Sequence, residues 1–67
     1  MTGGVELGRD AFDRSAWARA RTLLAAADSL DAADLQRLAV AAHLVGRDAE
    51  SSLAWERAQR ACERAGD

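Results

Sequence analysis

Residues 30–67 read LDAADLQRLAVAAHLVGRDAESSLAWERAQRACERAGD, and this stretch decides the fold. Gly46 lies near its middle, where a glycine can take the left-handed backbone conformation that ends a helix. Asp31 and Asp48 each precede an apolar run and can cap the helix that follows. The pattern predicts two amphipathic helices folded back on each other as a helical hairpin.

A stripe of apolar and small residues runs along one side of each predicted helix. They are Leu35, Leu38, Ala39, Ala42 and Val45 in a helix over about 32–45, and Ser51, Trp55, Ala58 and Cys62 in a helix over about 48–65. Steps of three and four place such residues on one stripe. The small residues of the two stripes let the two helix backbones approach closely. We expect Trp55 to fill the core volume that remains, and Cys62 to be a small core residue.

The residues before position 30 repeat this pattern. A shift of 31 residues superposes Leu7 on Leu38, Gly8 on Ala39, Ala11 on Ala42, Ser15 on Gly46, Ala20 on Ser51, Leu24 on Trp55 and Ala27 on Ala58. Self-similarity at such a period is the sign of a helical repeat. We therefore expect a flexible lead-in over residues 1–4, a first repeat over about 5–30 and a second over about 31–65.

The first repeat should hold helices over about 5–14 and 16–29. Ser15 is expected to cap the second of these, and Gly8 to weaken the first by roughly 1 kcal/mol relative to alanine. Trp17 is expected to be a core residue of this hairpin, because Trp17, Ala20, Leu24 and Ala27 recur at steps of three and four.

Composition supports a single all-α domain. Seventeen alanines, no proline and no tyrosine in 67 residues favour helix throughout. The lone Cys62 and the lack of a secretory pattern indicate a cytoplasmic setting, and no apolar run is long enough for a membrane span. All nine basic residues are arginine, which suggests a GC-rich bacterial genome. The net charge of -2 gives no electrostatic reason to expect nucleic-acid binding.

We expect neither catalysis, a cofactor nor a metal. His43 and Cys62 are the only His and Cys, too few for a tetrahedral metal set, and Cys62 is expected in the core. Thr2-Gly3-Gly4 is too short for a phosphate-binding loop and follows no predicted strand. The acidic residues near helix ends are expected to serve capping and solubility; they are Asp28, Asp31, Asp34, Asp48 and Glu50.

Five residues are candidates for contact with a partner. Arg57, Arg60 and Arg64 step by three and four along the last helix and form a basic stripe that could bind an acidic peptide or terminus. The alternative is a solvated face interleaved with glutamates. Trp17 and Trp55 are interpreted as core residues, with partner anchoring as the alternative for either.

The second hairpin resembles a degenerate tetratricopeptide repeat. The resemblance rests on Leu35, Leu38, Ala39, Ala42, Gly46, Ser51, Trp55 and Ala58, at that repeat's spacing of large, small and turn residues. The family's usual tyrosine and glycine are replaced by Ala42 and Ala39, and its proline is absent. The resemblance implies a protein-protein interaction module, bound to a partner or self-associating through open repeat edges.

The turn Gly46-Arg47-Asp48 and the ending Glu63-Arg64-Ala65-Gly66-Asp67 also look like the repeat region of large bacterial regulators of the LuxR type. In that family the repeats carry sensing or assembly, and a separate region binds DNA. This implies a fragment or partner-dependent unit of a regulatory protein.

An alternative hypothesis makes residues 34–64 a DNA-binding helix-turn-helix. Ala42 and Gly46 fit its turn, and Ser51, Ser52 and Arg57 would reach DNA. Against it, Arg47 stands where that turn buries an apolar residue, and Trp55 would have to leave the core.

Overall fold

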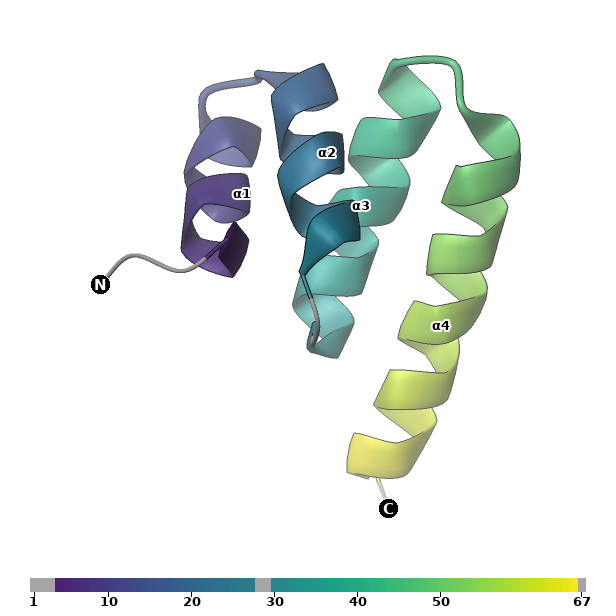
Figure 1. Cartoon of the computed structure of the whole chain (residues 1–67). Coiled ribbons are helices and arrows are strands. Elements are labelled where there is room, and N and C mark those ends of the chain that lie inside the picture. The colour runs from purple at the N-terminus through teal and green to yellow at the C-terminus, as the bar shows by residue number, and fades with distance from the viewer. Residues whose placement is uncertain (1–3, 28–29, 67) are drawn as a thin grey trace.

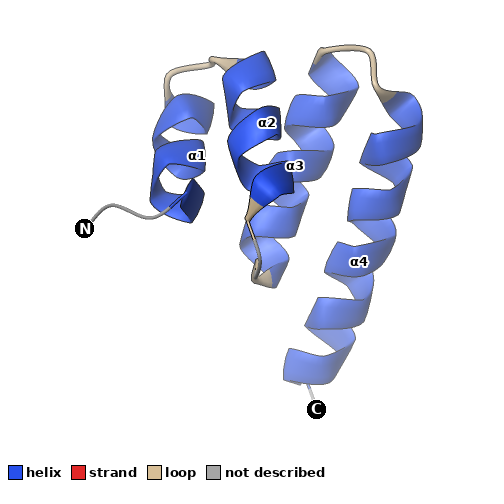
Figure 2. Cartoon of the chain, in the orientation of Figure 1, coloured by secondary structure: helices blue, strands red, loops and turns tan. Residues whose placement is uncertain are grey.

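The computed structural model describes residues 4–27 and 30–66, which form four helices: α1 (Gly4–Asp13), α2 (Trp17–Ala26), α3 (Ala32–Leu44) and α4 (Asp48–Gly66). No strand occurs in the described part of the chain (Figure 2). The predicted all-α fold of four helices is confirmed. Gly4, expected in the lead-in, already belongs to α1, while residues 1–3 lie outside the described ranges. α2 is shorter than predicted, and residues 28–29 of its expected end are also outside them.

The four helices run alternately up and down, so that each is antiparallel to the next along the chain (Figure 1). α1 packs against α2 and α3 against α4, which makes two hairpins. α3 also packs against α2 and touches α1. α3 is therefore the helix that joins the first hairpin to the second.

The turns that close the two hairpins have the same backbone geometry. Ser15 and Gly46 both have a positive φ, 61° and 81°. Each turn also makes the two backbone hydrogen bonds of a Schellman motif. They join Ala16 N–H to Ala11 O (2.8 Å) and Ser15 N–H to Phe12 O (3.0 Å) in the first turn, and Arg47 N–H to Ala42 O (2.8 Å) and Gly46 N–H to His43 O (3.1 Å) in the second. Corresponding atoms lie 31 residues apart.

The structure confirms one of the three predicted caps. The Asp31 carboxylate accepts a hydrogen bond from Asp34 N–H (2.8 Å) at the start of α3. Ser15 was wrongly predicted to cap α2, because it takes the left-handed conformation that ends α1; Ala16 precedes α2 without a side-chain cap. Asp48 lies inside the first turn of α4, where its carboxylate is 3.4 Å from His43 Nδ1.

The core consists mainly of alanines and a few leucines. Its buried apolar residues are Ala11, Ala20, Leu24, Leu35, Leu38, Ala39, Ala41, Ala42, Ala54 and Ala58. Leu24 of α2 packs with Leu38 of α3 and Ala54 of α4, which joins the two hairpins. Ala41 of α3 packs against Ala11 and Ala20 of the first hairpin.

Gly8 is a packing residue. It is buried, and a Cβ built on it would lie 2.7 Å from Cγ and Cδ2 of Leu24. The missing side chain lets Leu24 sit directly on the backbone of α1. The sequence-based view of Gly8 as a weak point of α1 overlooked this contact.

Two expected core residues, and Leu7 as the counterpart of the stripe residue Leu38, lie elsewhere. Trp55 is 47% exposed and Leu7 is 40% exposed, and Cys62 is also exposed. The buried side of α4 around Trp55 is formed by Ser51, Ala54 and Ala58, so Trp55 lies at the edge of that side.

Candidate functional site

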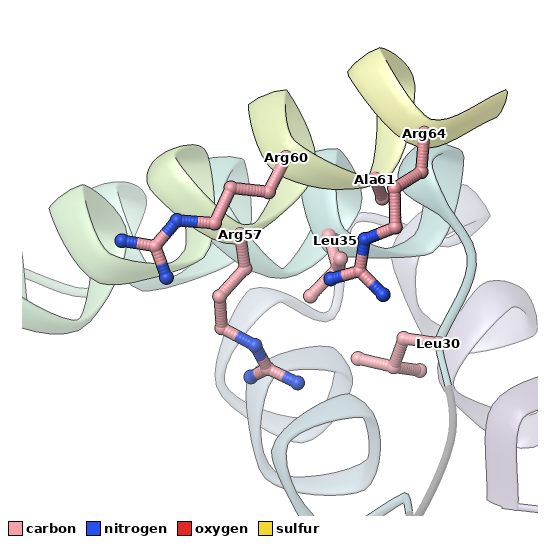
Figure 3. Close-up of a pocket in the computed structure, with 6 residues that line it drawn as sticks. All are labelled: Leu30, Leu35, Arg57, Arg60, Ala61 and Arg64. Atoms are coloured by element: carbon pink, nitrogen blue, oxygen red, sulfur yellow. The ribbon is translucent and has the colours of Figure 1, made fainter. Parts of the chain in front are cut away.

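The last turns of α4 form one side of an open groove of about 620 Å³. Its lining residues are Leu30, Leu35, Arg57, Arg60, Ala61 and Arg64. Figure 3 shows Arg57 and Arg64 extending from α4 toward the side where Leu30 lies. The three arginines that the sequence singled out thus line one groove, together with two leucines from another part of the chain.

The groove exists because α4 is longer than its counterpart α2. At the 31-residue shift, Arg57 corresponds to Ala26, the last residue of α2. α4 continues beyond this point to Gly66 and extends past the start of α3 (Figure 1). In this part of α4, Arg60, Ala61 and Arg64 line the groove together with Leu30, which precedes α3. The arginine spacing predicted the basic side of the groove, but the leucines could not be assigned to it before the tertiary arrangement was known.

The charges of these arginines are not neutralised within the described part of the chain. Five other arginines have a carboxylate oxygen within 4.0 Å: Arg9, Arg14, Arg21, Arg37 and Arg47. Arg57, Arg60 and Arg64 make no such ion pair among the described residues, and all three are exposed. The groove therefore offers three guanidinium groups that have no ion-pair partner among residues 4–27 and 30–66, beside apolar surface. This combination suits an anionic segment that also carries an apolar side chain.

The two tryptophans do not belong to this groove. Trp17 is half-buried and its ring packs edge-on against Phe12, with ring centroids 5.1 Å apart. Trp55 lines a separate hollow of about 250 Å³, along with Phe12 and Val40. Trp17 is therefore only partly the core residue that was expected. Trp55 is a surface residue beside a depression.

Two carboxylates that the sequence assigned to capping and solubility instead join helices. Asp34 of α3 is 1% exposed and accepts two hydrogen bonds from the Arg9 guanidinium of α1, both 2.7 Å long. Arg37 adds a third at 3.0 Å. The hydrogen bonds from Arg9, reinforced by its charge, hold the pKa of Asp34 below its ordinary value, although burial acts in the opposite direction.

Glu50 of α4 forms a similar bidentate pair with Arg21 of α2, at 2.7 and 3.1 Å. The hydrogen bonds from Arg21 lower the pKa of Glu50, and those to Glu50 raise the pKa of Arg21. These ion pairs join residues 25 and 29 positions apart in the chain, so helix-period reasoning could not find them. Both fix the first hairpin to the second.

His43 and Cys62 are held apart. His43 lies in the last turn of α3, and Cys62 lies fourteen residues after the start of α4, roughly 20 Å along the helix axis. Within the described ranges, no three His, Cys, Asp or Glu side chains gather in a way that could hold a metal ion. None of the described helices has the length and apolar character needed to cross a membrane.

Comparisons with protein-family models, with curated proteins and with solved structures find no match. The function is therefore inferred from the geometry of the chain itself.

Proposed function

We propose that this chain is a non-catalytic protein-protein interaction module of two tetratricopeptide-like hairpins. The observation that carries the proposal is the pair of hairpin turns, which share positive φ values and Schellman hydrogen bonds at positions 31 residues apart. A chain that repeats one hairpin at such a period stacks its units and offers extended surfaces to partners.

The packing of Gly8 supports the likeness to tetratricopeptide repeats. That family's pattern places Leu-Gly in the first helix, and Ala followed four residues later by a large apolar residue in the second. Leu7-Gly8 and Ala20 with Leu24 fit this pattern, and Leu24 lies against Gly8 at a distance that excludes a Cβ. In the second hairpin, Ser51 donates a hydrogen bond of 2.8 Å to the Ala39 carbonyl, so the backbones of α3 and α4 also approach closely.

The resemblance to repeats of LuxR-type regulators supports a place in a bacterial regulatory protein. The features behind it are the alanine and arginine content, the Gly46-Arg47-Asp48 turn and the ending of the chain. Under this proposal the module takes part in sensing or assembly.

The arginine groove is the surface on which we place a partner. Arg57, Arg60 and Arg64 would bind carboxylates, while Leu30 and Leu35 would accept an apolar side chain. The proposed ligand is an acidic, leucine-containing segment of another protein.

A labelled peptide of alternating acidic residues and leucines tests this proposal by fluorescence anisotropy. We predict saturable binding that weakens as salt is raised, because the arginines are exposed. The double variant Arg60→Glu with Arg64→Glu should weaken binding at least about tenfold, the equivalent of about 1.4 kcal/mol.

The matched control is Arg14→Glu with Arg19→Glu, which makes the same change in net charge on the first hairpin. It should bind the peptide nearly as well as the unmodified chain. Equal loss in both double variants would mean that only net charge matters, and absence of binding would reject the groove as a peptide site.

The helix-turn-helix hypothesis receives mixed support. The exposure of Trp55 removes one objection to it. However, α3 and α4 pack side by side as an antiparallel pair (Figure 1), whereas the helices of that motif cross at roughly 90–120°. The first turn of α4 also carries Asp48 and Glu50, which would repel phosphates at the end that reads DNA. We therefore keep the interaction module as the proposed function.

A further inference from the structure

The internal contact between the two hairpins provides a template for contact between two chains. In that contact, Leu24 of α2 packs against Leu38 of α3. In the repeat pattern, Leu24 of the first hairpin corresponds to Trp55 of the second, 31 residues later. Leu38 of the second hairpin corresponds to Leu7 of the first, 31 residues earlier. Both counterparts are large apolar residues left exposed, Trp55 at 47% and Leu7 at 40%. The α4 end of the chain thus presents one half of the contact, and α1 presents the other half.

We propose that two copies of this chain associate head to tail, with Leu7 of one copy packed on Trp55 of the other. This inference rests on the repeat arrangement put forward as the proposed function. In the complex, α1 of the second copy takes the position on α3 and α4 that α3 takes on α1 and α2. Trp55 also borders a hollow with Val40, where part of this helix would lie.

The remaining exposed leucines distinguish this specific contact from nonspecific hydrophobic association. Leu44 and Leu53 are more exposed than Leu7 or Trp55, at 51% and 60%. Their counterparts at the shift are Asp13 and Thr22, which are exposed residues of the first hairpin. The template therefore assigns neither leucine to the interface, and either can serve as a control.

The charges at the proposed contact are compatible. Inside the chain, Ala41 packs beside Phe12 and Ala16. At the 31-residue shift, Ala41 corresponds to Asp10, Phe12 to His43 and Ala16 to Arg47. The proposed contact therefore places Asp10 of one copy beside His43 and Arg47 of the other. The internal pair of Arg21 with Glu50 becomes Ser52 with Arg19, which creates no like-charge contact. Because that ion pair is not reproduced between chains, the association should be weaker than the internal contact. The attraction between Asp10 and Arg47 should make it depend on salt.

A head-to-tail contact uses two different surfaces, so each copy has one of each to offer. Sedimentation velocity of the full chain should show a mass that rises steadily between about 1 µM and about 1 mM, the range of weak complexes. Leu7→Arg and Trp55→Arg should each remain monomeric. An equimolar mixture of the two variants should form a 1:1 complex, since each retains the surface that the other has lost. Leu53→Arg should associate like the unmodified chain.

Several outcomes would overturn the proposal. These are a chain that stays monomeric throughout the concentration series, equal loss of association in Leu53→Arg, or variants that fail to complement each other when mixed. The variant Trp17→Phe gives a second readout that leaves the interface intact. Its single remaining tryptophan, Trp55, should shift to shorter emission wavelength as concentration rises, and unchanged emission would also contradict the contact. Peptide binding at the arginine groove does not involve these residues, so the two proposals can fail separately.

Discussion

Ser15 and Gly46 occupy corresponding turn positions, but only one of them is the residue type that this backbone favours. A side chain at positive φ costs about 1–2 kcal/mol, which glycine avoids. Nothing lies within 4 Å of a Cβ built on Gly46, so a substitution there would act through the backbone alone.

We predict that Gly46→Ala lowers the free energy of unfolding by about 1 kcal/mol, or about 4–8 °C in Tm for a domain of this size. Ser15→Gly should leave Tm unchanged or raise it slightly. Glycine relieves the backbone strain of the positive φ at residue 15, and this gain balances or exceeds the destabilisation that comes from the greater conformational entropy of the unfolded chain. Thermal unfolding followed by circular dichroism measures both changes. Gly4→Ala is the control, since Gly4 has no positive φ and an open surrounding. A Gly46→Ala variant as stable as the parent would contradict the turn geometry.

Asp34 makes stability depend on acid pH. Its pKa is lowered in the folded chain, so its contribution is fully present above the unfolded value of about 4 and is lost as pH falls toward the folded value. Asp34→Asn should cost roughly 2 kcal/mol at neutral pH, the scale of a hydrogen-bonded buried charge, and should flatten the profile below about pH 4.

Chemical denaturation at a series of pH values tests this prediction. Asp10→Asn is the matched control, because Asp10 also pairs with an arginine but both side chains are exposed. A loss at Asp34 no larger than the loss at Asp10 would mean that the buried pair does not stabilise the fold.

At the scale of helices, the Gly8 contact sets the distance between α1 and α2. Gly8→Ala should destabilise the chain by about 1–3 kcal/mol, because the added Cβ overlaps Leu24 and the gain in helix propensity offsets only part of this cost. In a double-mutant cycle, Gly8→Ala should cost much less in a Leu24→Ala background. If the two substitutions are additive, Gly8 does not act through Leu24.

The helices themselves were largely predictable because their signals are local. Alanine content, the stripe of Leu35, Leu38, Ala39 and Ala42, the Asp31 cap and the Gly46 turn all depend on neighbours in sequence. Positions set by contact between helices were not predictable in this way. Trp55 fits the predicted stripe of α4, but the buried side of that helix is formed by Ser51, Ala54 and Ala58 and leaves Trp55 exposed. Asp34 has an acceptable local role that concealed its pairing with Arg9.

The candidate groove was predictable only in part, for the same reason. The spacing of Arg57, Arg60 and Arg64 placed them on one face of one helix. Leu30 and Leu35 join them through tertiary structure. Among the described residues, the buried Asp34 pairs with Arg9 and Glu50 pairs with Arg21, and neither pairing can be read from the arginine spacing.

At the scale of the whole molecule, the proposed arrangement consists of two repeats of the same helical hairpin. The surface around Trp55 on the second repeat is then the place where a further hairpin would dock. A direct test joins residues 1–58 to residues 28–67, so that the α2–α3 link follows Ala58 as it follows Ala27. A second copy of α3 then meets α4 as the first copy meets α2.

The decisive measurement compares thermal unfolding and tryptophan emission of this three-hairpin chain with those of the original, at concentrations where both are monomeric. Trp17 and the added copy of Trp55 are replaced by phenylalanine, and the reference chain carries Trp17→Phe, so that the original Trp55 is the only fluorophore in each. We predict a Tm at least about 5 °C higher, because stacked repeats add interface energy, and a shift of Trp55 emission to shorter wavelength. An unchanged Tm with unchanged emission would contradict the repeat arrangement.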